Sequence, residues 1–400
     1  MKICKIWDAD YPWDIRVEKV CDSLTQAGHS VHLVCRNQER RQRLEQHGQL
    51  SIHRLPYLSY AFEPVHTLCN SPFPVNPVWV AAIGSVIRKY QVDLILVRDI
   101  LLALPSAVLG RAFRIPVVLD MAENYPAMLQ DRLRYTPTSP LGRLARNPIQ
   151  ARFVERLCLR MVDHTIVVVE ESQERLLRAG LSSDRLSIVN NTPKLDRWGS
   201  ARQGHAQGTG QEAVALVYLG NLDGSRGIDV TIQAIQHLKD QDFLATLTVI
   251  GDGPNLKEFR DMARQLGVSD RITFTGRLSF SRVQDFVARS DIGLIPHYAT
   301  DAWNTTIPNK LFDYMSSELP VIVSDAKPMA RIVRQEGCGE VFKDRDPYDL
   351  SRCIRGLMDP IVRQRLGQRG HAAIRRRYNW NYDSEILLET LRAVRKRYDS

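Results

Sequence analysis

PNKLFDYMSSELPVIVSD, residues 308–325, joins a helical pattern directly to a buried strand. Apolar residues such as Leu311 and Tyr314 recur at about helical spacing, and a short apolar run follows them. Lys310 and Asp313 stand near the start of the predicted helix. A charged helix that feeds a buried strand is typical of a parallel α/β unit, so this passage sets the fold class that we expect.

The polar side chains of this helix suggest a nucleotide site. The N-terminus of a helix can hold a phosphate, and Lys310 can add a positive charge there. Asp313, about one turn deeper, can accept hydrogen bonds from two vicinal hydroxyl groups such as those of a ribose. On this segment alone, an ordinary α/β connection with a charged helix face explains the pattern equally well, so the rest of the chain has to decide.

The rest of the chain predicts two α/β domains. Its 400 residues, 44% hydrophobic and 25% charged, exceed what one compact core usually holds. Strand-like and helical runs alternate in both halves, which is typical of parallel, doubly wound sheets. We expect two Rossmann-like domains facing a cleft, residues 1–195 and 212–375, joined by a polar, glycine-rich linker at 196–211. Residues 376–400 carry a helical apolar stripe and are expected to pack back towards the first domain.

No stretch of the sequence is expected to span a membrane or to direct secretion. The longest apolar runs, Val78–Ile87 and Val214–Leu219, are shorter than the ~20 residues that a bilayer span needs. The first apolar run meets Asp8 and Asp10 too early for a secretory signal and is typical of a buried strand. We therefore expect a cytoplasmic protein.

The sequence predicts neither disulfides nor a metal site. Its seven cysteines are scattered and form no C-x-x-C pair, which favours reduced and mostly buried thiols without a functional role. Two Asp-x-Asp runs, at 8–10 and 344–346, are short enough to occur by chance. A metal is unnecessary, because Arg226, Lys310 and helix dipoles can neutralise phosphate.

A net charge of +9 favours an anionic partner. Arg152, Arg156 and Arg160 recur every fourth residue along a predicted helix, next to an apolar row that starts at Phe153. Such a helix can rest peripherally on anionic lipid at the inner face of a membrane, or it can present a solvated basic face while its apolar side packs into the core. Nucleic acid is disfavoured, because the chain shows no aromatic interleaving and no zinc-finger or RNA-binding motif.

Two glycine-containing turns follow predicted strands in the second half of the chain. In YLGNLDGSRGID, residues 218–229, glycines let the backbone approach an anion, and Arg226 can neutralise a diphosphate. IGDGP, residues 250–254, is a weaker signal, because short Gly-x-Gly turns are common in α/β connections. Neither turn completes a Gly-x-Gly-x-x-Gly fingerprint, and the chain has no Walker A sequence. The pattern therefore favours a nucleotide-sugar as the ligand.

Five segments of the second half, in this order, resemble the donor half of a GT-B retaining glycosyltransferase of family 4, or glycosyltransferase group 1. They are YLGNLDGSRGID, VIGDGP, ITFTGRL, SDIGLIP and PNKLFDYMSSELPVIVSD. The first half agrees more loosely, through YPWDIRVEKVCDSLTQAGHSVHLVC, VDLILVRD and PVVLDMAENYPAML, so the resemblance spans nearly the whole chain.

This resemblance implies a hexosyltransferase-like enzyme without a cofactor. Its co-substrate is a UDP- or GDP-sugar, and it transfers the sugar with retention to a glycan or lipid-linked acceptor. Cell-surface polysaccharide or glycoconjugate biosynthesis is the implied setting. Two alternatives stay open: a GT-B-like sugar-nucleotide epimerase, which needs no acceptor, and a noncatalytic protein that binds sugar-nucleotides.

The resemblance also implies a donor site. It assigns the diphosphate to Gly220, Arg226 and Lys310, with Arg226 at a position that is usually lysine. It assigns the ribose to Asp313, at a position that is commonly glutamate, and Asn221 stands where arginine is common. The full set of implied donor-binding residues is Gly220, Asn221, Arg226, Gly227, Gly251, Gly253, Thr305, Thr306, Asn309, Lys310 and Asp313.

Thr305 departs from the family pattern, because it stands in place of the earlier glutamate of a paired-glutamate motif. A sugar contact usually made by that carboxylate is then missing, and Thr306 or the backbone nearby can contact phosphate instead. His297 follows a predicted strand near the proposed cleft, and we interpret it as a loop histidine without a ligand role.

The acceptor half departs from the family pattern at Ala122, where the resembling stretch often carries histidine. Asp120 and Glu123 are the catalytic candidates, with the task of orienting the acceptor or the donor sugar. A strand-end aspartate that caps the next helix is an equal interpretation of Asp120. Asp14 and Arg16, which follow the first strand, are the implied acceptor-binding residues.

Overall fold

The computed structural model describes residues 1–59, 62–72, 76–136, 142, 147–195, 198 and 213–399. Nearly all of the predicted linker, 196–211, lies outside the described residues. The chain divides into two compact units. Unit 1 comprises Met1–Pro126, Asn147–Asn191 and Tyr382–Ser400, and unit 2 comprises Ala127–Arg146 and Thr192–Asn381.

Unit 1 is built on a sheet with the strand order β3-β4-β2-β1-β5-β6-β7-β8. Its pairings are parallel except for the antiparallel pair of β3 and β4 at one edge. The strands are β1 (Lys2–Ile6), β2 (Ser30–Cys35), β3 (Leu44–His47), β4 (Leu50–Arg54), β5 (Leu94–Arg98), β6 (Val117–Met121), β7 (His164–Val167) and β8 (Leu186–Ile188). The order reverses direction between β1 and β5, and ligands of open α/β sheets bind at such a switch point.

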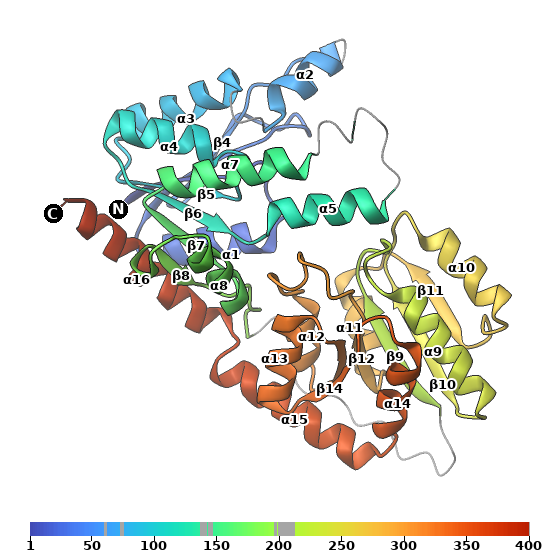
Figure 1. The fold of residues 1–400 in the computed structure, drawn as a ribbon. Helices are drawn as coiled ribbons and strands as arrows, with labels where there is room; N and C mark the ends of the chain where they lie inside the picture. The colour runs from blue at the N-terminus through green and yellow to red at the C-terminus, as the bar shows by residue number, and fades with distance from the viewer. Residues whose placement is uncertain are drawn as a thin grey trace. The chain divides into compact units, whose positions relative to one another are not determined.

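Helices cover both faces of this sheet (Figure 1). They are α1 (Ile15–Gln26), α2 (Glu63–Asn70), α3 (Pro77–Tyr90), α4 (Ala103–Phe113), α7 (Pro148–Met161), α8 (Glu170–Arg178) and α16 (Trp380–Asp399), with a short 3₁₀ turn η2 (Ser183–Arg185). A core cluster joins the sheet to apolar residues such as Trp79 of α3, Ala107 of α4 and Leu159 of α7. Most of α16, Tyr382 onwards, belongs to unit 1, where Leu391 is buried.

Unit 2 contains a wholly parallel sheet with the order β11-β10-β9-β12-β13-β14. Its strands are β9 (Val214–Leu219), β10 (Ala245–Ile250), β11 (Ile272–Gly276), β12 (Ile292–Ile295), β13 (Val321–Ser324) and β14 (Gly339–Phe342). Its helices are α5 (Tyr125–Tyr135, which starts in unit 1), α9 (Ile228–Asp240), α10 (Leu256–Gln265), α11 (Phe280–Ala288), α12 (Lys310–Ser316), α13 (Lys327–Glu336), α14 (Pro347–Gly356) and α15 (Pro360–Arg376). Here the switch point lies between β9 and β12.

The predicted fold class is confirmed, because both units are α/β structures on mainly parallel sheets. The opening passage behaves as its pattern indicates: α12 buries Leu311 and Tyr314, and β13 is buried throughout. Among the described residues, none of the helices combines the length and the apolar character needed to cross a bilayer.

Candidate active site

The first glycine turn of unit 2 lies at the switch point, between the end of β9 and the start of α9. Gly220 has φ +136° and Gly227 has φ +69°, conformations that residues with a Cβ rarely adopt. A Cβ on Gly227 would lie 1.8 Å from the carbonyl oxygen of Pro296, just after β12. Glycine at position 227 therefore lets the start of α9 approach the backbone that follows β12.

The second glycine turn supports the first one. A Cβ on Gly251 would lie 1.9 Å from the carbonyl oxygen of Gly220, and a Cβ on Gly253 would lie 2.5 Å from that of Leu222. The Leu222 N–H also donates a hydrogen bond to the backbone carbonyl oxygen of Asp252, which joins the two turns. The structure thus gives Gly251 and Gly253 a packing role, and their predicted contact with the donor stays a prediction.

Lys310 reaches from the first residue of α12 into the glycine turn. Its Nζ lies where a side chain on Gly220 would start, 2.8 Å from the position of that Cβ. It also lies 4.0 Å from the centre of the Tyr218 ring and 3.2 Å from His297 Nε2. The structure therefore brings together Gly220 and Lys310, two residues predicted for the diphosphate that are 90 positions apart in the sequence.

Arg226 belongs to the same cluster and is held from two sides. Its Nε donates to Asp223 Oδ2 at 2.8 Å, and its guanidinium lies 4.6 Å from the centre of the Trp303 ring. Burial alone would raise the pKa of Asp223, but the Arg226 charge and hydrogen bonds from Ser225 and Arg226 outweigh it and hold that pKa below its usual value. Asp223 is therefore ionised at neutral pH and fixes the arginine over the indole.

His297 is fully buried behind this cluster, and the sequence did not predict that position. Its ring lies 4.2 Å from the ring of Trp303, and its carbonyl oxygen accepts a hydrogen bond from Ser324. Burial is the main cause that holds the pKa of His297 well below its usual range, and the charge of Arg226 acts in the same direction, so the ring is neutral. The sequence did contain a hint of this arrangement, because His297 and Trp303 both lie within ten residues of the end of a predicted strand.

Asp313 lies one turn into α12, where its carboxylate accepts a hydrogen bond from Trp198 Nε1 at 2.8 Å. Trp198 also packs edge-on against Phe280 of α11, with ring centres 5.3 Å apart. A buried indole therefore fixes the side chain that was predicted to bind ribose. The role of Trp198 was not visible in the sequence, because it depends on a contact over 115 positions.

The remaining predicted donor residues surround this cluster less closely. The Thr305 hydroxyl shares its hydrogen between the backbone carbonyl oxygens of Asp301 and Ala302, so it is hydrogen-bonded within its own turn. Thr306 is buried, Asn309 is exposed at the start of α12, and Asn221 is exposed. Donor contacts by these four residues stay predictions.

Asp120, at the end of β6 in unit 1, is buried among three cations. Arg16 binds it through Nε and through Nη2 at 2.7 Å, Lys5 Nζ lies 3.4 Å away, and Arg98 Nη1 lies 3.7 Å away. Burial would raise its pKa, but these charges outweigh it and hold the pKa far below the usual range. Asp120 is thus permanently ionised, and this geometry favours a role in orienting the cations over proton transfer.

The predicted acceptor residues lie in the same part of unit 1. Asp14 caps α1 by accepting from the Val17 N–H at 2.8 Å, and Arg16 is committed to Asp120 and to the carbonyl oxygen of Asn190. Glu123 is half-buried in the segment between β6 and α5. The catalytic and acceptor roles of Asp14, Arg16 and Glu123 stay predictions.

Arg98 is the residue at this switch point that sequence reasoning missed. It ends β5 and is 6% exposed, and its Nε and Nη1 atoms have no hydrogen-bond partner among the described residues. Its ion-pair contacts are long, 3.6 Å to Asp99 and 3.8 Å to Asp14, and the Trp7 ring lies 5.7 Å away. Buried guanidinium donors are rarely left unsatisfied, so Arg98 can donate hydrogen bonds to a polar ligand at the switch point of unit 1.

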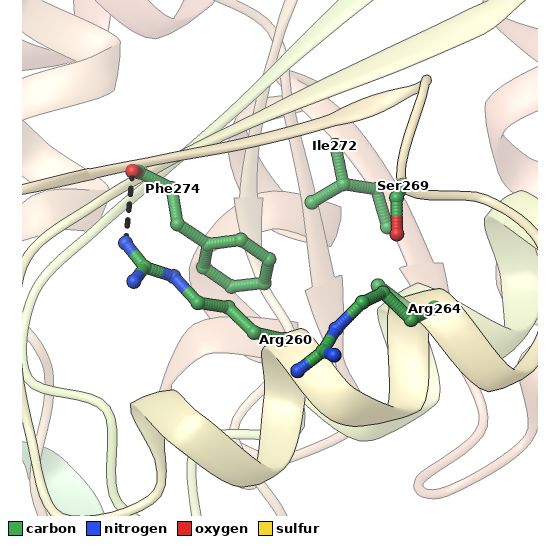
Figure 2. Close-up of a pocket in the computed structure, with 6 residues that line it drawn as sticks. Arg260, Arg264, Ser269, Ile272 and Phe274 are labelled. Atoms are coloured by element: carbon green, nitrogen blue, oxygen red, sulfur yellow. Dashed lines mark hydrogen bonds between the residues drawn. The ribbon is translucent and has the colours of Figure 1, made fainter.

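A pocket of about 300 Å³ lies on unit 2 between α10 and β11. Figure 2 shows Arg260 extending from α10 to the backbone of Phe274, where it donates a hydrogen bond to the carbonyl oxygen. Arg264 on its rim pairs with Asp261. This pocket is at the edge strand of the sheet and contains none of the predicted site residues. Within the described ranges, no three His, Cys, Asp or Glu side chains are grouped as a metal site would need.

Two family models match the chain. The model described as glycosyl transferase 4-like domain matches residues 14–192, and the model described as glycosyl transferases group 1 matches residues 213–359. The second match contains every donor residue predicted above, and the first contains the predicted acceptor and catalytic residues.

Curated relatives are distant. The chain is 25% identical to D-inositol 3-phosphate glycosyltransferase 2 of Catenulispora acidiphila over 257 residues, which cover 59% of this chain and 58% of that protein. It is 20% identical to glycogen synthase of Mycobacterium tuberculosis over 295 residues, covering 73% of this chain and 67% of that one. The chain thus spans little more than half the length of the first of these relatives.

Solved structures share the fold over nearly the whole chain. Sucrose-phosphate synthase from Thermosynechococcus elongatus superimposes with a TM-score of 0.75 at 19% identity, covering 98% of both chains. HepE from Anabaena, solved in complex with UDP, gives 0.71 at 14% identity, covering 98% of this chain and 100% of that one.

Proposed function

Because the chain belongs to the group 1 glycosyltransferases and has the GT-B fold, we propose that it transfers a sugar from a nucleotide-sugar to an acceptor hydroxyl. The donor is a UDP- or GDP-sugar, and the transfer retains the anomeric configuration. The acceptor is a glycan or a lipid-linked glycan on the cytoplasmic side of the membrane, as in the synthesis of cell-surface polysaccharide.

The observation that carries the proposal is the cluster at the switch point of unit 2. Arg226 lies in the glycine turn, where Asp223 holds it, and Lys310 reaches the same turn at Gly220. Asp313 lies one turn deeper on the helix that Lys310 begins. A nucleoside diphosphate needs cations at its phosphates and an acceptor for its ribose hydroxyls, and this cluster offers both. HepE, which shares the fold, has been solved with UDP and with UDP-glucose, which favours uridine as the first base to test.

The chemistry that this cluster supports is electrostatic. As the bond from the anomeric carbon to the diphosphate oxygen breaks, negative charge grows on the leaving group, where Arg226, Lys310 and the glycine-turn backbone can stabilise it. The acceptor oxygen forms the new bond to the same carbon from the same face. Its proton passes to the departing diphosphate, so the protein does not need to supply a nucleophile.

The acceptor is placed at the switch point of unit 1 in this proposal. Arg98 offers unsatisfied donors there, and Asp14 and Glu123 offer carboxylates that hydroxyl groups can donate to. Alternating donors and acceptors of this kind suit the hydroxyls of a sugar ring. Asp120 then acts as a positioning residue, because it holds Arg16 and Arg98.

Peripheral contact with a membrane is supported by the outer face of α7. Ile149 and Phe153 are 74% and 67% exposed there, and Arg152, Arg156 and Arg160 are exposed on the same helix. Apolar side chains among arginines match the requirements of an anionic lipid surface. This surface would bring the enzyme to a lipid-linked acceptor.

The test is an incubation of the purified protein with UDP- and GDP-sugars, with and without glycan and lipid-linked acceptors. Nucleoside diphosphate release and sugar products are followed by mass spectrometry. Acceptor-dependent release that Arg226→Ala and Lys310→Ala abolish supports the transferase. An altered free nucleotide-sugar indicates the epimerase instead, and binding without any turnover indicates the noncatalytic binder.

A further inference from the structure

The contact between His297 and Lys310 lies inside the proposed donor site, yet the transfer chemistry makes no use of the histidine. His297 has no exposed surface, and its Nε2 lies 3.2 Å from Lys310 Nζ. Its other ring nitrogen, Nδ1, is buried and has no hydrogen-bond partner in the part of the chain that the structure describes. Which of the two ring nitrogens carries the proton therefore depends on the contact of Nε2 with Lys310 and on the lack of a described partner at Nδ1.

The unpartnered Nδ1 limits where the proton of the neutral ring can be. If Nδ1 carried it, a buried N–H donor would be left unsatisfied, and buried N–H groups without a partner are rarer in proteins than acceptors without one. If Nε2 carries it, Nδ1 keeps only an unused lone pair, and the Nε2–H donates to Lys310 Nζ. An amine can accept that hydrogen bond only when it is uncharged, because an ammonium has no lone pair.

The charges around Lys310 act in both directions. Burial and the neighbouring Arg226 lower its pKa well below the usual value, whereas Asp223 and Asp313 act to raise it. The face of the Tyr218 ring, 4.0 Å from Nζ, also favours the ammonium. The net shift of the Lys310 pKa is downward, which is the direction that favours the uncharged amine.

We infer that His297 holds Lys310 as an uncharged amine and that a bound diphosphate charges this lysine. The inference rests on the proposed function, because it assumes that the donor diphosphate lies at the Gly220 turn. On binding, Lys310 Nζ takes one proton from solvent, and the ammonium donates its hydrogen bonds to phosphate oxygens. His297 is thus a positioning residue whose Nε2–H, together with burial and Arg226, favours the uncharged form of Lys310 before the nucleotide arrives.

This coupling makes nucleotide affinity depend on pH in a defined direction. The pKa of Lys310 is higher in the complex than in the free protein, so binding takes up a proton at any pH between those two values. Within that range the Kd rises as pH rises, by up to about tenfold for each pH unit. Release of the nucleoside diphosphate returns the proton to solvent.

Titration calorimetry with UDP and with GDP, in several buffers of different ionisation enthalpy, measures the proton directly. We choose about pH 8, where a terminal phosphate with a second pKa of about 6 is already fully ionised and contributes no proton. The slope of observed enthalpy against buffer ionisation enthalpy gives the number of protons taken up. We expect a slope near one and a Kd that increases from about pH 7.5 to about pH 9.

Two variants assign the proton. Lys310→Arg is charged at every accessible pH, so whatever binding of UDP or GDP this variant retains should occur without proton uptake. In His297→Gln the amide oxygen can accept from the ammonium, so Lys310 should be charged beforehand and uptake should fall. Circular dichroism melting checks that both variants are folded.

The outcomes separate the inference from the proposed function. Binding of UDP or GDP with a slope of zero would overturn the inference and leave the donor site intact, as would uptake that persists in Lys310→Arg. If neither UDP, GDP nor inorganic pyrophosphate binds, the proposed donor site fails and the inference fails with it.

Discussion

Replacing Asp313 by asparagine tests whether the opening segment of the sequence holds a ribose. The substitution keeps the size of the side chain and an oxygen for the Trp198 indole, whose Nε1 now donates to the carboxylate at 2.8 Å. What it removes is the negative charge. A carboxylate can accept from the indole and from two hydroxyls at once, because its two oxygens offer about four lone-pair sites.

The size of the effect follows from the hydrogen bonds that change. A hydrogen bond to a charged group contributes about 1.5–3 kcal/mol and one between neutral groups about 0.5–1.5 kcal/mol. The difference is about 1 kcal/mol for each ribose hydroxyl, or about 2 kcal/mol for both. Since about 1.4 kcal/mol corresponds to a factor of ten, Asp313→Asn should raise the Kd for UDP about 30-fold.

The assay compares UDP with 2′,3′-dideoxy-UDP by calorimetry, or the guanosine pair if GDP is the ligand. The wild-type protein should prefer the nucleotide with hydroxyls, and Asp313→Asn should lose most of that preference while binding the dideoxy nucleotide as the wild type does. Asp285→Asn on α11, an exposed carboxylate in the same unit, is the matched control. Equal weakening of both nucleotides by Asp313→Asn would refute the assignment of the ribose.

Three further predictions follow from the other contacts. Gly253→Ala places a Cβ 2.5 Å from the carbonyl oxygen of Leu222 and should lower the melting temperature by several degrees, whereas Gly356→Ala, with open space at its Cβ, should not. Arg98→Ala should raise the KM for the acceptor about tenfold or more, through the loss of hydrogen bonds from a charged donor, and leave UDP affinity within about twofold. Phe153→Asp should weaken sedimentation with phosphatidylglycerol vesicles, and equal retention by phosphatidylcholine vesicles would contradict an anionic membrane surface.

The sequence predicted the local conformations of the donor half well. Helical and strand spacing located α12 and β13, and glycines after strand patterns located both turns. These features depend on residues that are neighbours in the chain, so a period or a turn residue is enough to indicate them. Residue spacing could not distinguish glycines that contact the ligand from glycines that pack against the first turn. Gly251 and Gly253 were predicted to bind the donor, but the backbone of the first turn occupies the space where their Cβ atoms would lie.

The contacts that give the site its charges could not be predicted in the same way. Trp198 reaches Asp313, and Arg16 and Arg98 reach Asp120, through pairings that the order of strands and the packing of helices decide. Each of these side chains lies far in sequence from its partner, and no period connects them. His297 is another example: the sequence indicated a loop histidine without a ligand role, but its side chain is buried against the amine of Lys310.

The departures of this chain from the family pattern are linked by structure. Asn221, where the family commonly has arginine, donates from Nδ2 to Asp223 Oδ2 at 3.1 Å. Arg226 donates to the same oxygen at 2.8 Å. An arginine at 221 would compete with Arg226 for that carboxylate and would place a second cation near Lys310, beside Arg226. The asparagine instead shares Asp223 with Arg226 without adding charge. The position that appeared to weaken phosphate binding therefore hydrogen-bonds the carboxylate that holds Arg226 over Trp303, and under the proposal above it spares Lys310 a second cationic neighbour.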